Sequence, residues 1–185
     1  RLLTQADWPK AELHFWEDGY DLTLAKLMAR RGLPTLLLAT GDPMHFGIGA
    51  TLSTKLSAHE YESIHNASAF SLAAARLEWP LQDVNCVSLH GRPADQLARH
   101  LSPGARLFVL TSSGQTIAEA AAVLQRCGYG RSRMIVLEHM GGPQERTAEL
   151  LPEEAADQSF ADLNTLAIEC EPFPQTPHFA AVPGL

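Results

Sequence analysis

Short apolar runs alternate with helix-forming segments along this chain, and this alternation limits the folds that it can adopt. The helical segments carry apolar residues at helical spacing, whereas the runs between them are short and almost continuously apolar. We expect strands over residues 34–39, 61–65, 86–89, 106–110, 132–138 and 164–170. We expect helices over residues 21–32, 68–78, 94–100, 116–127 and 144–150. Strands that alternate with helices predict an α/β fold with substantial parallel pairing.

The 185 residues are enough for one large domain or for two small packed lobes. A predicted helix ends at Trp79-Pro80 and a polar stretch follows, so we place a lobe boundary near residues 82–85. The lobes are then residues 1–82 and 83–170. Residues 171–185 contain four prolines and are predicted to form an extended linker. Because the chain begins with Arg1 and ends in this linker, we expect it to be part of a longer protein.

Charge and hydropathy argue against two broad classes of partner. A formal net charge of -7 is unfavourable for general nucleic-acid binding, which needs a clustered excess of Lys and Arg. No apolar run approaches the roughly 20 residues of a membrane-spanning helix, so we expect no membrane association. The three cysteines and the histidines lack the spacing of a zinc site or a disulfide framework. We therefore expect a cytoplasmic protein with reduced thiols and no bound metal.

The loop Thr40-Gly41-Asp42-Pro43 follows directly on the first predicted strand. In a parallel α/β sheet, ligands bind beyond the carboxyl ends of the strands. Glycine lets a ligand approach the backbone closely, and the Asp42 carboxylate can accept bonds from hydroxyl or ammonium groups. The same residues also fit an ordinary turn in which Asp42 caps a helix. Gly47 and Gly49 come next and indicate close packing of this backbone, against either a ligand or a sheet.

Three further stretches are more specific when they are read together with Leu38-Ala39-Thr40-Gly41-Asp42-Pro43. They are Ser68-Ala69-Phe70-Ser71-Leu72-Ala73-Ala74-Ala75-Arg76-Leu77, Val87-Ser88-Leu89-His90-Gly91-Arg92-Pro93 and Leu137-Glu138-His139-Met140-Gly141-Gly142-Pro143-Gln144-Glu145-Arg146. In their order and spacing, from about Pro34 onwards, the chain resembles the precorrin-6Y C5,15-methyltransferase (decarboxylating) family. The resemblance is to the N-terminal, tetrapyrrole methylase portion of that family.

This resemblance implies a two-lobed α/β tetrapyrrole methylase fold with a cofactor cleft between the lobes, in an enzyme that forms a homodimer. The implied cofactor is S-adenosylmethionine, which leaves as S-adenosylhomocysteine. The implied cofactor contacts are Thr40, Gly41, Asp42, His45, Ser68, Ala69, Leu110 and Met140. The chain departs from the family at Thr40, where the family has glycine, and at His65-Asn66-Ala67, where the family has a proline-rich or serine-rich run.

The implied reaction is methylation of a precorrin in cobalamin biosynthesis, of precorrin-6Y at C5. A separate C-terminal methyltransferase domain is then expected to carry out C15 methylation and decarboxylation. Such a tetrapyrrole carries many acetate and propionate groups, and our candidates for contacting it are His90, Arg92 and Arg146. Each also has a structural interpretation, as a hydrogen-bonded strand-end histidine or as part of a salt bridge.

Two other functions stay open from the sequence. One is methylation of another ring carbon by a member of the same superfamily. The other is a non-catalytic module that binds tetrapyrrole or cofactor as a scaffold. We assign no catalytic base, because methyl transfer depends mainly on positioning and on desolvation of the reacting groups.

Overall fold

The computed structural model describes residues 10, 12–15 and 19–174 and divides the chain into two compact units, Arg1–Ile64 and His65–Leu185. The second unit begins before the boundary expected near residues 82–85, because helix α3 (Ala69–Leu77) packs on the sheet of this unit. The lobe limits of the whole protein stay a prediction. Most of the expected linker, residues 175–185, lies outside the described residues.

The described part of the first unit contains two helices, α1 (Tyr20–Ala29) and α2 (Ile48–Leu52). The Tyr20 hydroxyl donates a hydrogen bond of 2.8 Å to the Thr51 hydroxyl and so joins the two helices. Arg31 binds both carboxylate oxygens of Glu60 at 2.5 Å and ties the end of α1 to the segment after α2. The helix expected over residues 21–32 is confirmed as α1.

The two strands expected in the first unit, over residues 34–39 and 61–65, are wrong. Neither segment belongs to a strand, and every strand of the described residues lies in the second unit. A strand needs a neighbour to take its backbone hydrogen bonds, and no described segment of the first unit pairs with either one. The apolar side chains of the earlier segment are correspondingly exposed, Leu36 by 63%.

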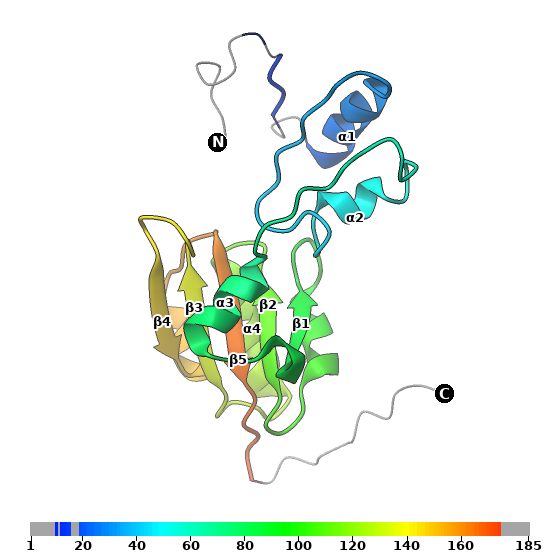
Figure 1. The fold of residues 1–185 in the computed structure, drawn as a ribbon. Helices are drawn as coiled ribbons and strands as arrows, with labels where there is room; N and C mark the ends of the chain where they lie inside the picture. Colours follow the sequence, from blue (N-terminus) through cyan, green and yellow to red (C-terminus); the bar gives the residue numbers. More distant parts are fainter. Residues whose placement is uncertain (1–9, 11, 16–18, 175–185) are drawn as a thin grey trace, which may run out of the picture. The chain divides into compact units, whose positions relative to one another are not determined.

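The second unit is built on a single five-stranded sheet with the strand order β1-β2-β5-β3-β4 (Figure 1). The strands are β1 (Val84–Ser88), β2 (Arg106–Leu110), β3 (Arg133–Glu138), β4 (Arg146–Leu150) and β5 (Asn164–Glu169). β1 and β2 pair in parallel, β5 lies antiparallel between β2 and β3, and β4 lies antiparallel beside β3. β1, β2 and β3 therefore all run in the same direction.

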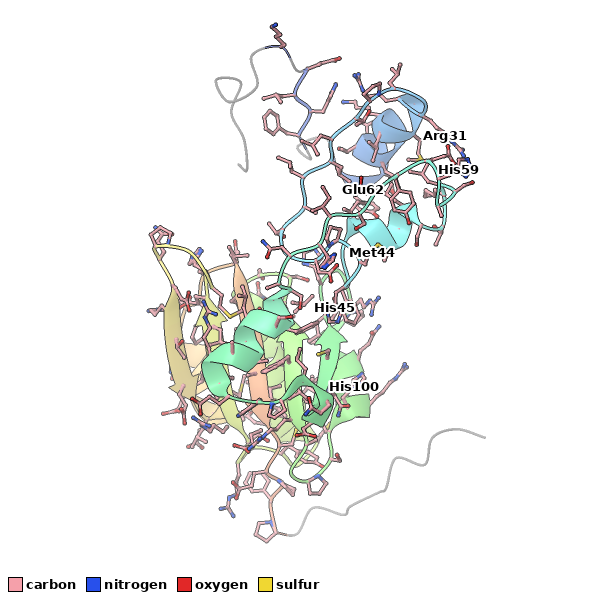
Figure 2. The ribbon with its side chains drawn as sticks, in the orientation of Figure 1. Arg31, Met44, His45, His59, Glu62 and His100 are labelled. Atoms are coloured by element: carbon pink, nitrogen blue, oxygen red, sulfur yellow. The ribbon has the colours of Figure 1, made fainter. Side chains whose placement is uncertain are left out.

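Helices cover both faces of this sheet, α3 on one face and α4 (Gln115–Arg126) on the other (Figure 1). Three short 3-10 helices complete the described part of the unit, η2 (Leu81–Asp83), η3 (Ala94–His100) and η4 (Pro152–Asp157). Each face of the sheet has its own apolar core, and alternate residues of β2 point into one or the other. Leu107 and Val109 pack with α4, while Phe108 packs with α3. Figure 2 adds the side chains and labels His100, the last residue of η3.

Most of the elements expected in the second unit are confirmed, and so is the α/β class. The helix expected over residues 144–150 is wrong, because Arg146–Leu150 is the strand β4. Its Glu, Arg, Ala and Leu residues favour a helix in isolation, but pairing with β3 overrides that weak local preference. Parallel pairing is also less extensive than expected, since only β1 and β2 pair in parallel among the described strands.

We predict that Leu166→Ala lowers the free energy of unfolding by about 2–5 kcal/mol, because Leu166 is fully buried in β5 and its truncation leaves a cavity. Urea denaturation followed by circular dichroism measures this loss. Leu163→Ala is the matched control, since Leu163 lies just before β5 and is 63% exposed. The control should cost less than about 0.5 kcal/mol. Equal losses in the two variants would contradict the placement of Leu166 in the core.

Candidate functional site

The loop Thr40-Gly41-Asp42-Pro43 forms a compact turn in the first unit. Gly41 has a φ of 66°, in the left-handed region that favours glycine. The Asp42 carboxylate accepts a hydrogen bond of 2.8 Å from the backbone N–H of Met44, and the Asp42 carbonyl accepts one of 3.2 Å from His45. Met44 and His45 are exposed in the loop that leads to α2 (Figure 2). Asp42 thus stabilises a turn but does not cap α2, whose N-cap is Gly47.

The two glycines after this loop allow the chain to fold back on the turn. A Cβ atom on Gly47 would lie 2.6 Å from the Pro43 carbonyl oxygen, and one on Gly49 would lie 2.7 Å from the same atom. Both distances are shorter than a Cβ atom can tolerate without a backbone shift. Close packing against their own loop therefore accounts for these glycines without a ligand or a neighbouring sheet.

In the second unit, β1, β2 and β3 end at one edge of the sheet, which we call the carboxyl edge. β4 and β5 run the other way, so their first residues, Arg146 and Asn164, lie at this same edge. Ligands of α/β proteins bind beyond such an edge, where strands lead into loops and helices. The carboxyl edge carries five residues singled out from the sequence: His90, Arg92, Leu110, Met140 and Arg146.

Hydrogen bonds join the loop after β1 to the loop after β2. Nδ1 of His90 lies 3.2 Å from the carbonyl oxygen of Thr111. The Gly91 N–H donates to the Ser112 hydroxyl at 2.9 Å, and that hydroxyl donates to the Leu89 carbonyl at 3.1 Å. These bonds fix the backbone around His90, an exposed residue whose ring contact with Thr111 is part-buried. The guanidinium of Arg92 is also exposed and makes no ion pair with any described residue.

The hydrogen bonds continue across β5 to β3. The Thr111 hydroxyl donates to Oδ1 of Asn164 at 2.8 Å, and Nδ2 of Asn164 donates to the Ala161 carbonyl at 2.7 Å. The Ala161 N–H in turn donates to Oε1 of Glu138 at 2.5 Å. Thr111, Asn164 and Glu138 are all buried, so these bonds are shielded from water and stronger for it.

The Glu138 carboxylate also binds Arg146, whose Nε donates to Oε2 at 2.5 Å. This arginine, together with the Ala161 N–H, holds the pKa of Glu138 below its ordinary value, although burial acts in the opposite direction. Arg146 begins β4 and does not lie in the expected helix. Arg146 therefore forms a salt bridge with Glu138, which is its structural interpretation. A role of Arg146 in binding substrate stays a prediction.

The α3 face of the sheet is apolar where it reaches the carboxyl edge. Leu110 and Met140 are partly buried and pack against the core cluster that contains Phe70. His139 has a φ of 50°, a left-handed conformation that turns the chain after β3 and returns Met140 to this face. Phe70 directly follows Ser68 and Ala69 in the sequence.

Ser68 is the N-cap of α3, as the sequence predicts, because its hydroxyl accepts the N–H of Ser71 at 3.1 Å. A second ion pair, between Arg76 and Glu145, ties α3 to the loop after β3, with Nη2 of Arg76 2.8 Å from Oε2 of Glu145. Glu145 also accepts the Gly141 N–H at 2.6 Å. Arg76 and this backbone N–H lower the pKa of Glu145 to about 2. The loop that carries Met140 is therefore anchored on both sides.

No sequence motif contains Thr111 or Asn164, and Arg76 lies in one of the stretches that resemble the family but was not singled out. The available signal is positional, since Thr111 and Asn164 are polar residues directly next to apolar strands that meet at one edge. Thr111 and Asn164 are isolated polar positions outside the stretches that resemble the family.

Three further observations concern the part of the chain that the structure describes. No group of three or more His, Cys, Asp or Glu side chains there could hold a metal ion. No described helix is long and apolar enough to cross a membrane. Cys86, Cys127 and Cys170 are free thiols, and burial raises the pKa of Cys170 to about 12, which disfavours the reactive thiolate.

Comparison with known proteins decides the family. The family model of the tetrapyrrole (corrin/porphyrin) methylases matches residues 3–156. The chain belongs to the tetrapyrrole methylases. The fold agrees, since this tetrapyrrole methylase superimposes on the uroporphyrin-III C-methyltransferase of Thermus thermophilus complexed with S-adenosylhomocysteine. That match has a TM-score of 0.59 at 25% identity and covers 80% of this chain and 72% of the other.

Two relatives of this tetrapyrrole methylase are informative about activity. A Sinorhizobium precorrin-6Y C(5,15)-methyltransferase [decarboxylating] is 41% identical over 85% of this chain, but the chain spans only 38% of that enzyme. The cobalt-precorrin-7 C(5)-methyltransferase of Salmonella typhimurium is 28% identical over 78% of the chain, which spans 70% of that shorter relative. A precorrin-6Y methylase from Archaeoglobus fulgidus, 22% identical with a TM-score of 0.61 over 90% of this chain and 78% of the other, supports the fold.

We predict that Glu138→Gln lowers the free energy of unfolding by about 1–3 kcal/mol at neutral pH, because the buried carboxylate loses its charge-assisted bonds to Arg146 and Ala161. The pKa of Glu138 is lowered in the folded state. The wild type therefore has its full advantage in the free energy of unfolding above pH 4.5, the ordinary pKa of the carboxyl group. It is lost as the pH falls through the depressed value. Urea denaturation of both proteins across this range measures the difference.

Glu119→Gln is the control for this prediction, since Glu119 is exposed on α4. It should leave the free energy of unfolding nearly unchanged at every pH. A Glu138→Gln variant as stable as the wild type at neutral pH would contradict the role given to this carboxylate.

Proposed function

We propose that this chain methylates a precorrin carbon with S-adenosylmethionine in cobalamin biosynthesis, and that the substrate is precorrin-6Y, methylated at C5. The observation that carries the proposal is the 41% identity to the Sinorhizobium C(5,15)-methyltransferase over 85% of the chain. Carbon 5 is favoured over carbon 15 by the lengths of the relatives. The chain spans most of the Salmonella enzyme, which is named for C5 alone, but little more than a third of the enzyme named for both carbons.

The proposed cofactor contacts come from segments of both units. In the first unit they are Thr40, Gly41, Asp42 and His45, and in the second unit they are Ser68, Ala69, Leu110 and Met140. That these segments form one cleft stays a prediction from the family resemblance. S-adenosylmethionine supplies a methyl group on a positively charged sulfur and leaves as S-adenosylhomocysteine, the molecule bound in the Thermus structure.

The residues of the carboxyl edge have roles that suit this reaction. Leu110 and Met140 offer a firmly packed apolar surface, which excludes water and fixes the position of a bound group. Arg92 is exposed and unpaired among the described residues, so its planar guanidinium can bind an acetate or propionate group of the substrate through two hydrogen bonds. His90 and the outer side of Arg146, which is 60% exposed, border the same edge.

Assembly and location are also proposals. The family resemblance favours a homodimer in the cytoplasm, and the length of the Sinorhizobium relative favours a separate C-terminal methyltransferase domain in the whole protein. C15 methylation and decarboxylation are assigned to that domain and not to this chain.

We predict that the purified chain binds S-adenosylmethionine and S-adenosylhomocysteine in isothermal titration calorimetry. Asp42→Asn should weaken binding roughly tenfold or more, because it removes the charge but keeps the oxygen that accepts the Met44 N–H. Asp21→Asn, on the exposed surface of α1, is the control and should bind like the wild type. Failure of the wild type to bind either compound would contradict the proposed cofactor.

We further predict that the chain converts precorrin-6Y into a singly methylated product with the new methyl group on C5. NMR of the product made with ¹³C-methyl-labelled cofactor identifies the carbon. A label on another ring carbon would assign the chain to a different step of the same pathway. Cofactor binding without any methyl transfer would favour the scaffold alternative over an enzyme.

A further inference from the structure

Methylation of a ring carbon releases one proton for each methyl group transferred, and the carboxylates at the carboxyl edge are poorly placed to take it. Glu138 is buried and already bound by Arg146 and Ala161. Glu145 is bound by Arg76, which lowers its pKa to about 2. The Asp162 carboxylate accepts the N–H of Gly114 at 3.1 Å. Glu138 and Glu145 therefore favour the charged, deprotonated state, which makes them weak proton acceptors.

His90 is arranged differently. Nδ1 lies 3.2 Å from the Thr111 carbonyl oxygen, which can only accept a hydrogen bond, so Nδ1 carries the proton. In the neutral ring Nε2 is then left with a free lone pair. The residue is exposed at the carboxyl edge, two positions before Arg92.

The atom that orients His90 is itself held in place. Thr111 is buried, and its hydroxyl donates to Asn164, whose amide donates to Ala161. Thr111 is thereby fixed through its side chain while its carbonyl holds the imidazole. A general base oriented by a fixed hydrogen-bond partner is an arrangement common in enzymes.

We propose that Nε2 of His90 accepts the proton released when the substrate carbon is methylated, with Thr111 and Asn164 as positioning residues. This inference rests on the proposed methyl transfer. The π electrons of the substrate form the new carbon–carbon bond, and the electrons of the carbon–sulfur bond stay on the sulfur, which becomes neutral. The proton on the methylated carbon passes to Nε2, its bonding electrons restore the double bond, and the imidazolium returns the proton to water.

His139 directly follows β3 and also lies near this edge, but the structure favours His90 over it. No described residue makes a hydrogen bond with the His139 side chain, so its tautomer is not fixed. Its backbone φ of 50° serves to turn the chain after β3. His139→Asn is therefore the informative rival variant.

The tautomer provides a test that does not depend on activity. In ¹⁵N-labelled chain at a pH where the rings are neutral, long-range ¹H–¹⁵N NMR should show His90 protonated on Nδ1. Thr111→Val keeps the carbonyl but loses the hydroxyl bond to Asn164, and it should shift His90 toward a mixture of tautomers. His90 protonated on Nε2 in the wild type would overturn the proposal.

Single-turnover methyl transfer tests the role itself. His90→Asn keeps an amide that can reach the Thr111 carbonyl but has no proton acceptor at the position of Nε2. It should slow single-turnover methyl transfer about 100-fold, while the KM values for both substrates, measured in the steady state, change little. In His90→Gly, added imidazole should restore part of the rate, which a structural defect would not allow. His100→Asn, at the end of η3, is the control and should react like the wild type.

Three outcomes contradict the proposal. The first is a His90→Asn variant that reacts at the wild-type rate. The second is a His139→Asn variant that imidazole rescues. A His90→Gly variant that binds cofactor normally, reacts slowly and is not rescued by imidazole also contradicts it. A wild type that transfers no methyl group would contradict both this inference and the proposed function, whereas an active wild type isolates the test of His90.

Discussion

The position of β5 is the constraint on which the carboxyl edge depends. β5 lies antiparallel between β2 and β3 and pairs with β3 from Asn164 to Glu169 and with β2 from Thr165 to Glu169. Because both strands are antiparallel to β5, β2 and β3 run in the same direction although they are not neighbours. The loops after both strands therefore lie at the same edge. This pairing also places Asn164, the first residue of β5, between them. One strand thus sets the direction of two others and supplies the amide that connects their ends.

The polar contacts of the second unit differ in how much they can stabilise it. Arg126 with Asp95 and Arg133 with Glu149 are ion pairs between exposed side chains, and such pairs contribute little in water. Glu138 has a side chain that is only 3% exposed and uses both oxygens. A buried carboxylate that lost these partners would keep the cost of its desolvation. The network through Glu138 is therefore the one that fixes the geometry of the edge.

Local sequence patterns predicted what local interactions decide. α3 could be placed from its serine cap and its apolar spacing, and β2 from a continuous apolar run, because each pattern has one favourable structure. The segment at residues 34–39 has the same apolar character as β2 but no partner strand among the described residues, and pairing is not encoded within a segment. The helix predicted over residues 144–150 was wrong for the converse reason. β3 supplies a partner strand to residues that would otherwise favour a helix.

The residues of the candidate site also fall into those that the sequence could locate and those that it could not. The family resemblance located Leu110 and Met140, and a stretch that carries it contains His90. The common direction of three strands explains why these residues share an edge. Thr111 and Asn164 could not be found, because a single polar residue at a strand end becomes informative only once its neighbour across the sheet is known.

The alternation of side chains along β2 separates two kinds of chemistry at the carboxyl edge. Leu110 faces the apolar core under α3, whereas the next residue, Thr111, joins the polar network with Asn164. In the proposed reaction, the apolar surface positions the methyl donor and the substrate carbon, which need desolvation and alignment more than charge. The polar network beside it orients His90 for the proton that leaves afterwards. A one-residue change of register in β2 would exchange these two surfaces, so the pairing of β2 with β5 controls both steps.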